Sequence, residues 1–292
     1  MFDIIGKTRL WFLISGVLIA LAVFALSSNS FVRGKAMNFG IDFTGGTLLN
    51  LRFEKPVTVD EIRKVLDDFK LGESIIQKSG EQDILIRSVP LENETRTGIL
   101  KDLAEKVAGV EILEADVIGP TVGKELATQS IWALIIASIG IIIYVSFRFE
   151  FKYAVSALLA LYHDAIITTG IIALLWRTVD VGFVAAILTI MGYSINDTVV
   201  IYDRIRENLK KPALAKKKFH ELVNISIWET MARSINTILT VIVMVLCLLF
   251  LGGETLREFA LTLLIGFTLG GCSSIFVAPP ILVLWHKWES SR

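Results

Sequence analysis

Six long apolar stretches are the feature of this sequence that most limits what the chain can fold into. A membrane-crossing helix needs about 20 apolar residues, because the hydrocarbon layer is roughly 30 Å thick. With 53% hydrophobic and 20% charged residues, the chain is too apolar for a soluble domain and too charged to lie wholly in a membrane. We therefore predict a polytopic α-helical membrane protein with six transmembrane helices, near residues 10–28, 127–147, 153–176, 181–202, 234–251 and 258–285.

Lysine and arginine beside these spans predict the orientation, since short cytoplasmic loops are enriched in both. The two short loops expected on the outer side hold only Arg177 and Arg257. We therefore expect both termini in the cytoplasm. The first apolar run exceeds the roughly 7 to 15 residues of a signal-peptide core, so we expect a retained anchor. The cytoplasmic side then holds Lys7, Arg9, Arg148, Lys152, the run from Arg204 to Arg233, Lys287 and Arg292.

The net charge of zero argues against a nucleic-acid partner.

This topology divides the chain into five parts. The parts are a cytoplasmic N-terminus with the first span (1–28), an extracytoplasmic domain (29–125), spans two to four (126–202), a cytoplasmic amphipathic loop (203–232), and the last two spans with a short tail (233–292).

The extracytoplasmic segment has the pattern of a folded domain. Thr58 and Glu61 form a capping-box signature before an apolar helical stripe that ends near Gly72. A second helix is expected from about Thr95 to Ala108. With the strand-like runs the order is β-α-β-β-α-β, so we predict a small α+β ferredoxin-like domain. The predicted strands are Thr47 to Phe53, Ser74 to Ser79, Asp83 to Val89 and Val110 to Ile118.

The cytoplasmic loop contains the segment KKKFHELVNISIWETMAR, which has the pattern of an amphipathic helix. We expect this helix to lie along the membrane surface. Its basic residues are typical of a cytoplasmic loop; a docking patch for a cytoplasmic partner is the alternative.

Two charges lie at matched depth in neighbouring spans. Asp197 follows Asp180 by 17 residues and Arg233 precedes Gly252 by 19 residues, which places both about 26 to 28 Å from the outer face at 1.5 Å per residue. A permanent ion pair would be structural and is weak evidence for function. Alternatively Asp197 takes up and releases a proton and Arg233 responds to its charge, which would make the two residues a proton relay.

Other polar residues in the spans form a weaker candidate site. His163 and Asp164 are predicted near the middle of the membrane. Because neighbouring residues do not share one helix face, we expect one of them to bond a helix neighbour or a threonine such as Thr168 or Thr169. Helix packing and a relay role remain open for both. Asn196, beside Asp197, is included in this secondary polar site.

The remaining motifs indicate neither a nucleotide nor a metal. GPTVGKE (119–125) has one residue too few between its glycines for a phosphate-binding loop, and Glu125 replaces the required Ser or Thr. Gly45 and Gly46 are expected to form a turn, and the small residues of GFTLGGCSS favour close helix packing. Both cysteines lie in spans without metal-ligand spacing. We expect no cofactor, no metal and no enzymatic activity.

Several segments resemble the SecF family of bacterial protein-export subunits, which is related to SecD and belongs to the resistance-nodulation-division superfamily. The resemblance covers nearly the whole chain through FGIDFTGGT, VIGPTVGKEL, YVSFRFEFKYAVSALLALYHDAIIT, IMGYSINDTVVIYDRIREN and LREFALTLLIGFTLGGCSSIFVA.

The resemblance implies one six-helix half of a resistance-nodulation-division bundle. It implies a partnership with SecD beside the SecYEG channel, together with YajC and YidC, membrane lipid and a translocating unfolded polypeptide. The expected function is to promote late translocation steps with the proton motive force. Asp197 and Arg233 match the family's intramembrane Asp and Arg, whereas Ala232 stands where the family often has His.

Two alternatives belong to other classes. An exporter of small molecules or lipids in the same superfamily would need a larger outer domain and a second copy of this chain. A static assembly scaffold without ion flow would tolerate replacement of Asp197 by Asn.

Overall fold

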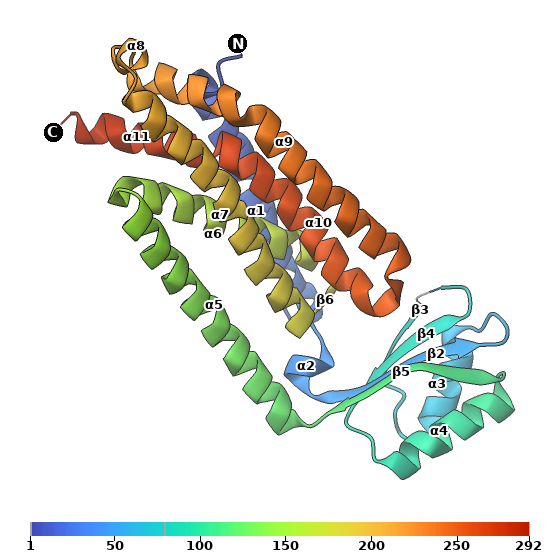
Figure 1. Ribbon diagram of the computed structural model, residues 1–292. Helices are drawn as coiled ribbons and strands as arrows, with labels where there is room; N and C mark the ends of the chain where they lie inside the picture. Colours follow the sequence, from blue (N-terminus) through green and yellow to red (C-terminus); the bar gives the residue numbers. More distant parts are fainter. Residues whose placement is uncertain (1, 79, 292) are drawn as a thin grey trace. The chain divides into compact units, whose positions relative to one another are not determined.

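Two compact units make up the chain. The computed structural model describes residues 2–78 and 80–291. The helical unit comprises Met1–Asn38 and Ala133–Arg292, and the outer unit comprises Phe39–Trp132. Figure 1 shows the long helices of the first unit and the twisted sheet of the second. Arg292 and Ser79, which entered the predictions of orientation and strand ends, lie outside the described residues.

Six stretches in the described residues are long and apolar enough to cross a membrane, as the sequence predicts. The structure extends most of them beyond the predicted limits, because the helical backbone continues into polar flanking turns. The helices outside the sheet domain are η1 (Ile5–Lys7), α1 (Thr8–Arg33), α5 (Pro120–Arg148), α6 (Phe151–Leu174), α7 (Val181–Leu209), α8 (Pro212–Ala215), α9 (Phe219–Leu251), α10 (Gly253–Phe276) and α11 (Ala278–Glu289), and a two-residue strand, β6 (Thr178–Val179), precedes α7.

A helix occupies most of the predicted amphipathic segment of 203–232, but it is not a separate element. α7 continues to Leu209, and after the short α8 the chain enters α9 at Phe219, which runs unbroken through the fifth apolar stretch. No Gly or Pro interrupts α9, so nothing separates an amphipathic segment from the span. Leu222, Val223 and Ile227 are buried in its first turns. The apolar stripe of this segment therefore packs within the helical unit.

The last predicted span consists of two helices. α10 ends at Phe276 and α11 begins at Ala278, with Val277 between them. Pro279 and Pro280 stand in the first turn of α11, where a missing N–H costs no helical hydrogen bond. The prolines thus explain why the chain bends here, and α11 packs against α6.

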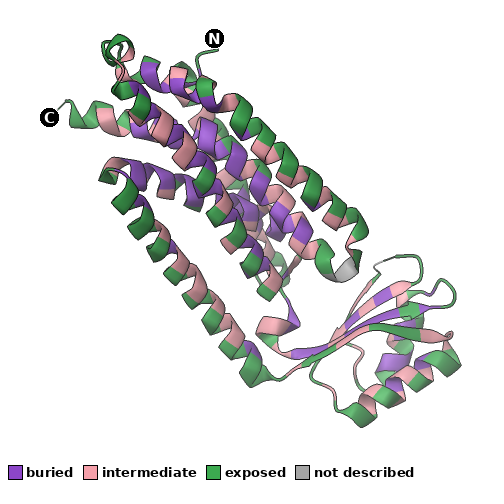
Figure 2. Ribbon diagram, in the orientation of Figure 1, coloured by how far each residue is buried: buried purple, intermediate pink, exposed green. Residues whose placement is uncertain are grey.

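The core of the helical unit lies between α6, α7 and α10. These helices pack on one another, and Figure 2 shows most of their inner turns as buried. The apolar windows of α1, α5 and α9 are only 11%, 6% and 11% buried, against 50% or more for the other three spans. The exposed apolar surfaces of α1, α5 and α9 are suited to lipid or to further helices.

The outer unit has the predicted β-α-β-β-α-β order. Its four-stranded sheet has the order β3-β4-β2-β5, and every neighbouring pair is antiparallel. This is the ferredoxin-like arrangement. Its elements are α2 (Ile41–Thr44), β2 (Gly46–Phe53), α3 (Val59–Asp68), β3 (Ile75–Lys78), β4 (Asp83–Ser88), α4 (Asn93–Lys106) and β5 (Val110–Ile118), and β1 (Asn38–Phe39) lies at the boundary of the two units.

The core of this unit follows from strand alternation. Leu49, Leu51 and Phe53 of β2 lie on one face of the sheet and are almost fully buried. They pack against the apolar stripes of α3 and α4, as expected for period-two strands facing amphipathic helices. The capping box is confirmed: the Glu61 N–H donates to the Thr58 hydroxyl at 3.3 Å, and the Thr58 N–H donates to the Glu61 carboxylate at 2.8 Å.

The two glycine motifs meet in the outer unit. Gly45 and Gly46 have φ of +70° and +140°, a region of backbone conformation that residues other than glycine rarely adopt. A Cβ on Gly45 would lie 2.9 Å from Pro120 Cα, and one on Gly123 would lie 2.9 Å from the Gly45 nitrogen. The GPTVGKE segment is therefore the start of α5, which begins at Pro120, and its backbone packs directly on the glycine turn.

Candidate functional site

Asp197 lies on the buried side of α7. Its exposed fraction is 3%, and its Oδ2 atom is buried without a hydrogen-bond partner in the described structure. Buried polar atoms are normally paired, and an ionisable group in a membrane span usually faces a protein interior or a water-filled cavity. The carboxyl group is thus placed where binding of a proton would remove an uncompensated charge.

Arg233 does not form an ion pair with Asp197. It lies on α9, which packs against α7, and its side chain is exposed. Within the described residues no salt bridge of 4.0 Å or less joins the two groups, although the guanidinium interacts electrostatically with the carboxyl group. The permanent pair considered from the sequence is therefore absent from this structure, and Arg233 acts on Asp197 over a longer distance.

Asp164 of α6 lies in a buried cluster of hydrogen-bonded polar side chains. Its Oδ2 accepts hydrogen bonds from the hydroxyls of Ser194 on α7 at 3.0 Å and Ser273 on α10 at 2.6 Å. Its Oδ1 lies 2.9 Å from His163 Nδ1. Asp164 is 1% exposed. Three helices thus converge on one carboxyl group.

These contacts bear out one of the two alternatives left open by the sequence, bonding to a helix neighbour, and not the other, bonding to Thr168 or Thr169. The partners of Asp164 are serines of other helices, because the Thr169 hydroxyl donates to the Ala165 carbonyl and the Thr168 hydroxyl has no partner in the described structure. His163 and Asp164 point in different directions from α6, yet the imidazole is long enough to reach its neighbour's carboxyl group.

Asn196 does not join this site. It is exposed on α7, whereas His163 and Asp164 lie at the buried junction of α6, α7 and α10. Successive residues of a helix point about 100° apart, which explains why Asn196 faces outward when Asp197 faces inward. The structure therefore separates Asn196 from the other two predicted residues.

Sequence reasoning missed the serine and threonine hydroxyls around Asp164. The Thr198 and Ser274 hydroxyls lie 3.0 Å apart, and the Thr198 hydroxyl donates to the Ser194 carbonyl at 3.1 Å. A Cβ on Gly270 would lie 3.1 Å from Ser194 Cβ, so glycine allows α10 to approach α7 closely. The GGCSS run was a signal for this contact, since it places hydroxyls beside packing glycines in an apolar span.

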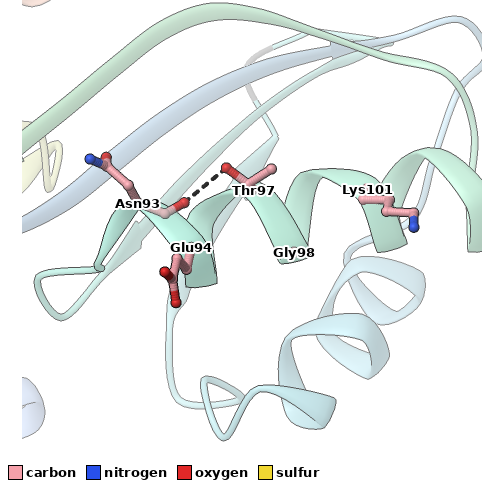
Figure 3. A pocket seen from close by; sticks show the side chains of 5 residues that line it. All are labelled: Asn93, Glu94, Thr97, Gly98 and Lys101. Atoms are coloured by element: carbon pink, nitrogen blue, oxygen red, sulfur yellow. Dashed lines mark hydrogen bonds between the residues drawn. The ribbon is translucent and has the colours of Figure 1, made fainter.

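The described part of the outer unit contains a pocket of a different kind. A shallow hollow on α4, shown in Figure 3, contains none of the residues predicted for function. No group of three or more His, Cys, Asp or Glu side chains among the described residues could hold a metal ion. The hollow is lined by Asn93, Glu94, Thr97, Gly98 and Lys101.

Comparison with known families identifies the chain. Residues 34–57 match the family described as the SecD/SecF GG motif, and residues 99–288 match protein export membrane protein SecD/SecF, C-terminal. The chain belongs to the SecD/SecF family of protein export membrane proteins. With its six apolar helices it is a multi-pass membrane protein of the bacterial inner membrane.

Relatives and solved structures agree with this assignment. Protein translocase subunit SecF of Sebaldella termitidis is 39% identical over 97% of this chain and 92% of its own length. SecF of Calditerrivibrio nitroreducens is 40% identical over 97% and 93%. A crystal structure of SecDF from Thermus thermophilus, described as a translocon-associated membrane protein, has 36% identity, a TM-score of 0.88 and 98% coverage of this chain.

The SecDF chain is much longer than this one. This chain spans 39% of its length, both in that structure and in SecDF in its super-membrane-facing form, which has a TM-score of 0.70. The similarity therefore confirms the fold and the family, and the role of the chain in protein translocation follows from its family.

Proposed function

We propose that this chain is an accessory subunit of Sec protein export that works with SecD and uses the proton motive force to promote late steps of translocation through SecYEG. The names of the relatives and the SecDF structure support the partnership with SecD. The six helices would then form one half of a resistance-nodulation-division bundle and SecD the other. YajC and YidC are further proposed partners.

The observation that carries the proton-driven part is the environment of Asp197. A carboxyl group 3% exposed in an apolar helix, with an unpartnered oxygen, is costly when ionised. Proton binding at this carboxyl neutralises it and changes its interaction with Arg233 on α9. Because α9 packs against both α7 and α10, a change in that interaction shifts helix packing and drives a conformational cycle.

The remaining roles follow from this cycle. The outer unit holds emerging polypeptide on the extracytoplasmic side, and both termini lie in the cytoplasm. The protein works without ATP, cofactor or catalysis. Because residue 232 is alanine, Arg233 is the basic residue at positions 232 and 233.

Export in cells whose only copy carries Asp197→Asn tests the proposal. Asp203→Asn is the matched control, because it makes the same change six residues further along α7, at an exposed carboxylate 3.3 Å from Arg148. We expect Asp197→Asn to stall export of a secreted precursor while the protein level stays normal, and Asp203→Asn to export normally. Normal export with Asp197→Asn would contradict the proposal and favour a static scaffold.

A further inference from the structure

His163 and Asp164 form a side-chain dyad on α6, in which the His163 side chain is 11% exposed and the Asp164 side chain 1% exposed. An ionised carboxylate only accepts hydrogen bonds, so whenever Asp164 is ionised the 2.9 Å contact with its Oδ1 requires the imidazole proton on Nδ1. His163 Nε2 is then an acceptor, and in the described structure it is buried without a hydrogen-bond partner. A carboxylate that orients an imidazole in this way leaves the other ring nitrogen free to bind a proton.

Among the described residues, the helices that pack on α6 carry lysine and arginine only near their ends. The helices α1, α7, α10 and α11 pack against α6, and their lysines and arginines, like those of α6, lie only in the first or last two turns. The Cys272 thiol of α10 interacts electrostatically with Asp164. Arg233 belongs to α9, which packs on α7 and α10. Outside their first and last two turns, the titratable residues of these four helices are Tyr193, Asp197 and Tyr202 of α7, and Cys272 lies in the last two turns of α10.

We propose that His163 and Asp164 form a single proton-binding site, separate from Asp197. Without a bound proton the dyad has a neutral imidazole and a carboxylate, with a net charge of −1. One proton taken from water brings the net charge to zero, shared between the imidazole and the carboxyl group. At 2.9 Å the His163 Nδ1 and Asp164 Oδ1 atoms are close enough to share one proton. An uncompensated charge at the centre of a helix bundle is costly, so proton binding is favourable there.

The hydroxyls around the dyad give it a connection to Asp197. Ser194 donates to Asp164 through its side chain, and its carbonyl accepts from Thr198, the residue next to Asp197. Ser273 and its neighbour Ser274 make the corresponding contacts from α10, to Asp164 and to the Ser194 carbonyl. A change in the charge of the dyad therefore acts on the helix segment that carries Asp197. The two sites share one polar junction of α6, α7 and α10.

Infrared titration of the purified full-length chain in lipid nanodiscs tests the site without any export assay. Protonated carboxyl groups have a C=O stretch that appears as protons bind. We expect a buried carboxyl band that is retained in Asp197→Asn and lost in Asp164→Asn. His163→Asn keeps a donor near the Nδ1 position but cannot bind a proton. It should therefore move the midpoint of this band by about one pH unit or more, the size of the coupling between two groups that share one proton.

Two further variants guard against misfolding. Ser273→Ala keeps the carboxyl group but removes its 2.6 Å donor, so the Asp164 band should change frequency. Thr168→Val is the matched control, because it removes a fully buried hydroxyl of the same helix that has no partner in the described structure, and it should leave the band unchanged.

Two results would overturn the proposal. If no pH-dependent band is lost in Asp164→Asn and none changes frequency in Ser273→Ala, Asp164 binds no proton. If the midpoint is the same in His163→Asn, Asp164 titrates alone and the dyad is not one site. Because Asp197→Asn is measured in parallel, failure here is distinguished from failure of the proton-driven export proposal.

Discussion

Replacement of Gly46 by alanine should lower the local stability of the sheet in the outer unit. Gly46 opens β2 with φ of +140°. A Cβ there would lie 2.5 Å from the Ser88 carbonyl oxygen, at the end of the register that pairs β2 with β4. Holding alanine in such a backbone region costs about 1 to 3 kcal/mol. The overlap with a backbone oxygen adds to this, because neither strand has a flexible atom that can move aside.

Hydrogen exchange of the full-length chain in nanodiscs measures this cost locally. A loss of about 2 kcal/mol in the opening free energy corresponds to about 30-fold faster exchange, and we expect it in the amides of β2 and β4. Gly119→Ala is the matched control, because a Cβ at Gly119 has no heavy atom within 4 Å and its φ is not positive. If Gly46→Ala exchanges no faster than Gly119→Ala, the argument from backbone conformation and close approach is wrong.

Three further results are expected. Gly170→Leu should separate α1 from α6 and lower the steady-state level of the protein, since a Cβ there overlaps α1, whereas Gly140→Leu, with open space around it, should not. Thr58→Ala should lower the opening free energy of α3 by about 1 kcal/mol. The hydrogen bond from the Thr58 backbone holds the pKa of Glu61 below its ordinary 4.5, so the contribution of Glu61 to stability is present above that pH and is lost as the pH falls through the folded-state pKa. Hydrogen exchange of α3 at pH 7, 4 and 3 would follow this loss. Asn208→Leu, which removes buried hydrogen bonds to two side chains of α9, should cost about 1 to 3 kcal/mol and lower the thermal midpoint in nanodiscs.

Much of the fold can be predicted from local sequence patterns. The capping box of Thr58 and Glu61, strand alternation around Leu51 and six apolar runs each depend on residues near one another in the chain, so the sequence predicts them directly. The β-α-β-β-α-β order of elements in the outer unit then predicts a ferredoxin-like sheet. Boundaries differed where a helix continued through polar turns, as α9 does after Phe219.

The partners of the site residues depend on contacts between distant segments. Asp164 is joined to Ser273, 109 residues further along, and no periodicity within α6 indicates which helix will cover it. Depth along the helices predicted that Asp197 and Arg233 would lie at one level, but depth does not determine the direction in which each side chain points, and Arg233 is exposed. The contact between Gly45 and Gly123 also joins distant segments, so the sequence does not predict it. Each glycine alone indicates only a turn or a helix start.

Translocation in inverted membrane vesicles that contain the complete Sec machinery tests the central claim most directly. A precursor is first driven part-way by ATP, and its completion is then followed with and without a proton gradient. Our account predicts that the gradient accelerates completion with the parent chain and has no effect with Asp197→Asn, while Asp203→Asn behaves as the parent. A gradient response that persists in Asp197→Asn vesicles would contradict the claim that this carboxyl group couples proton movement to export.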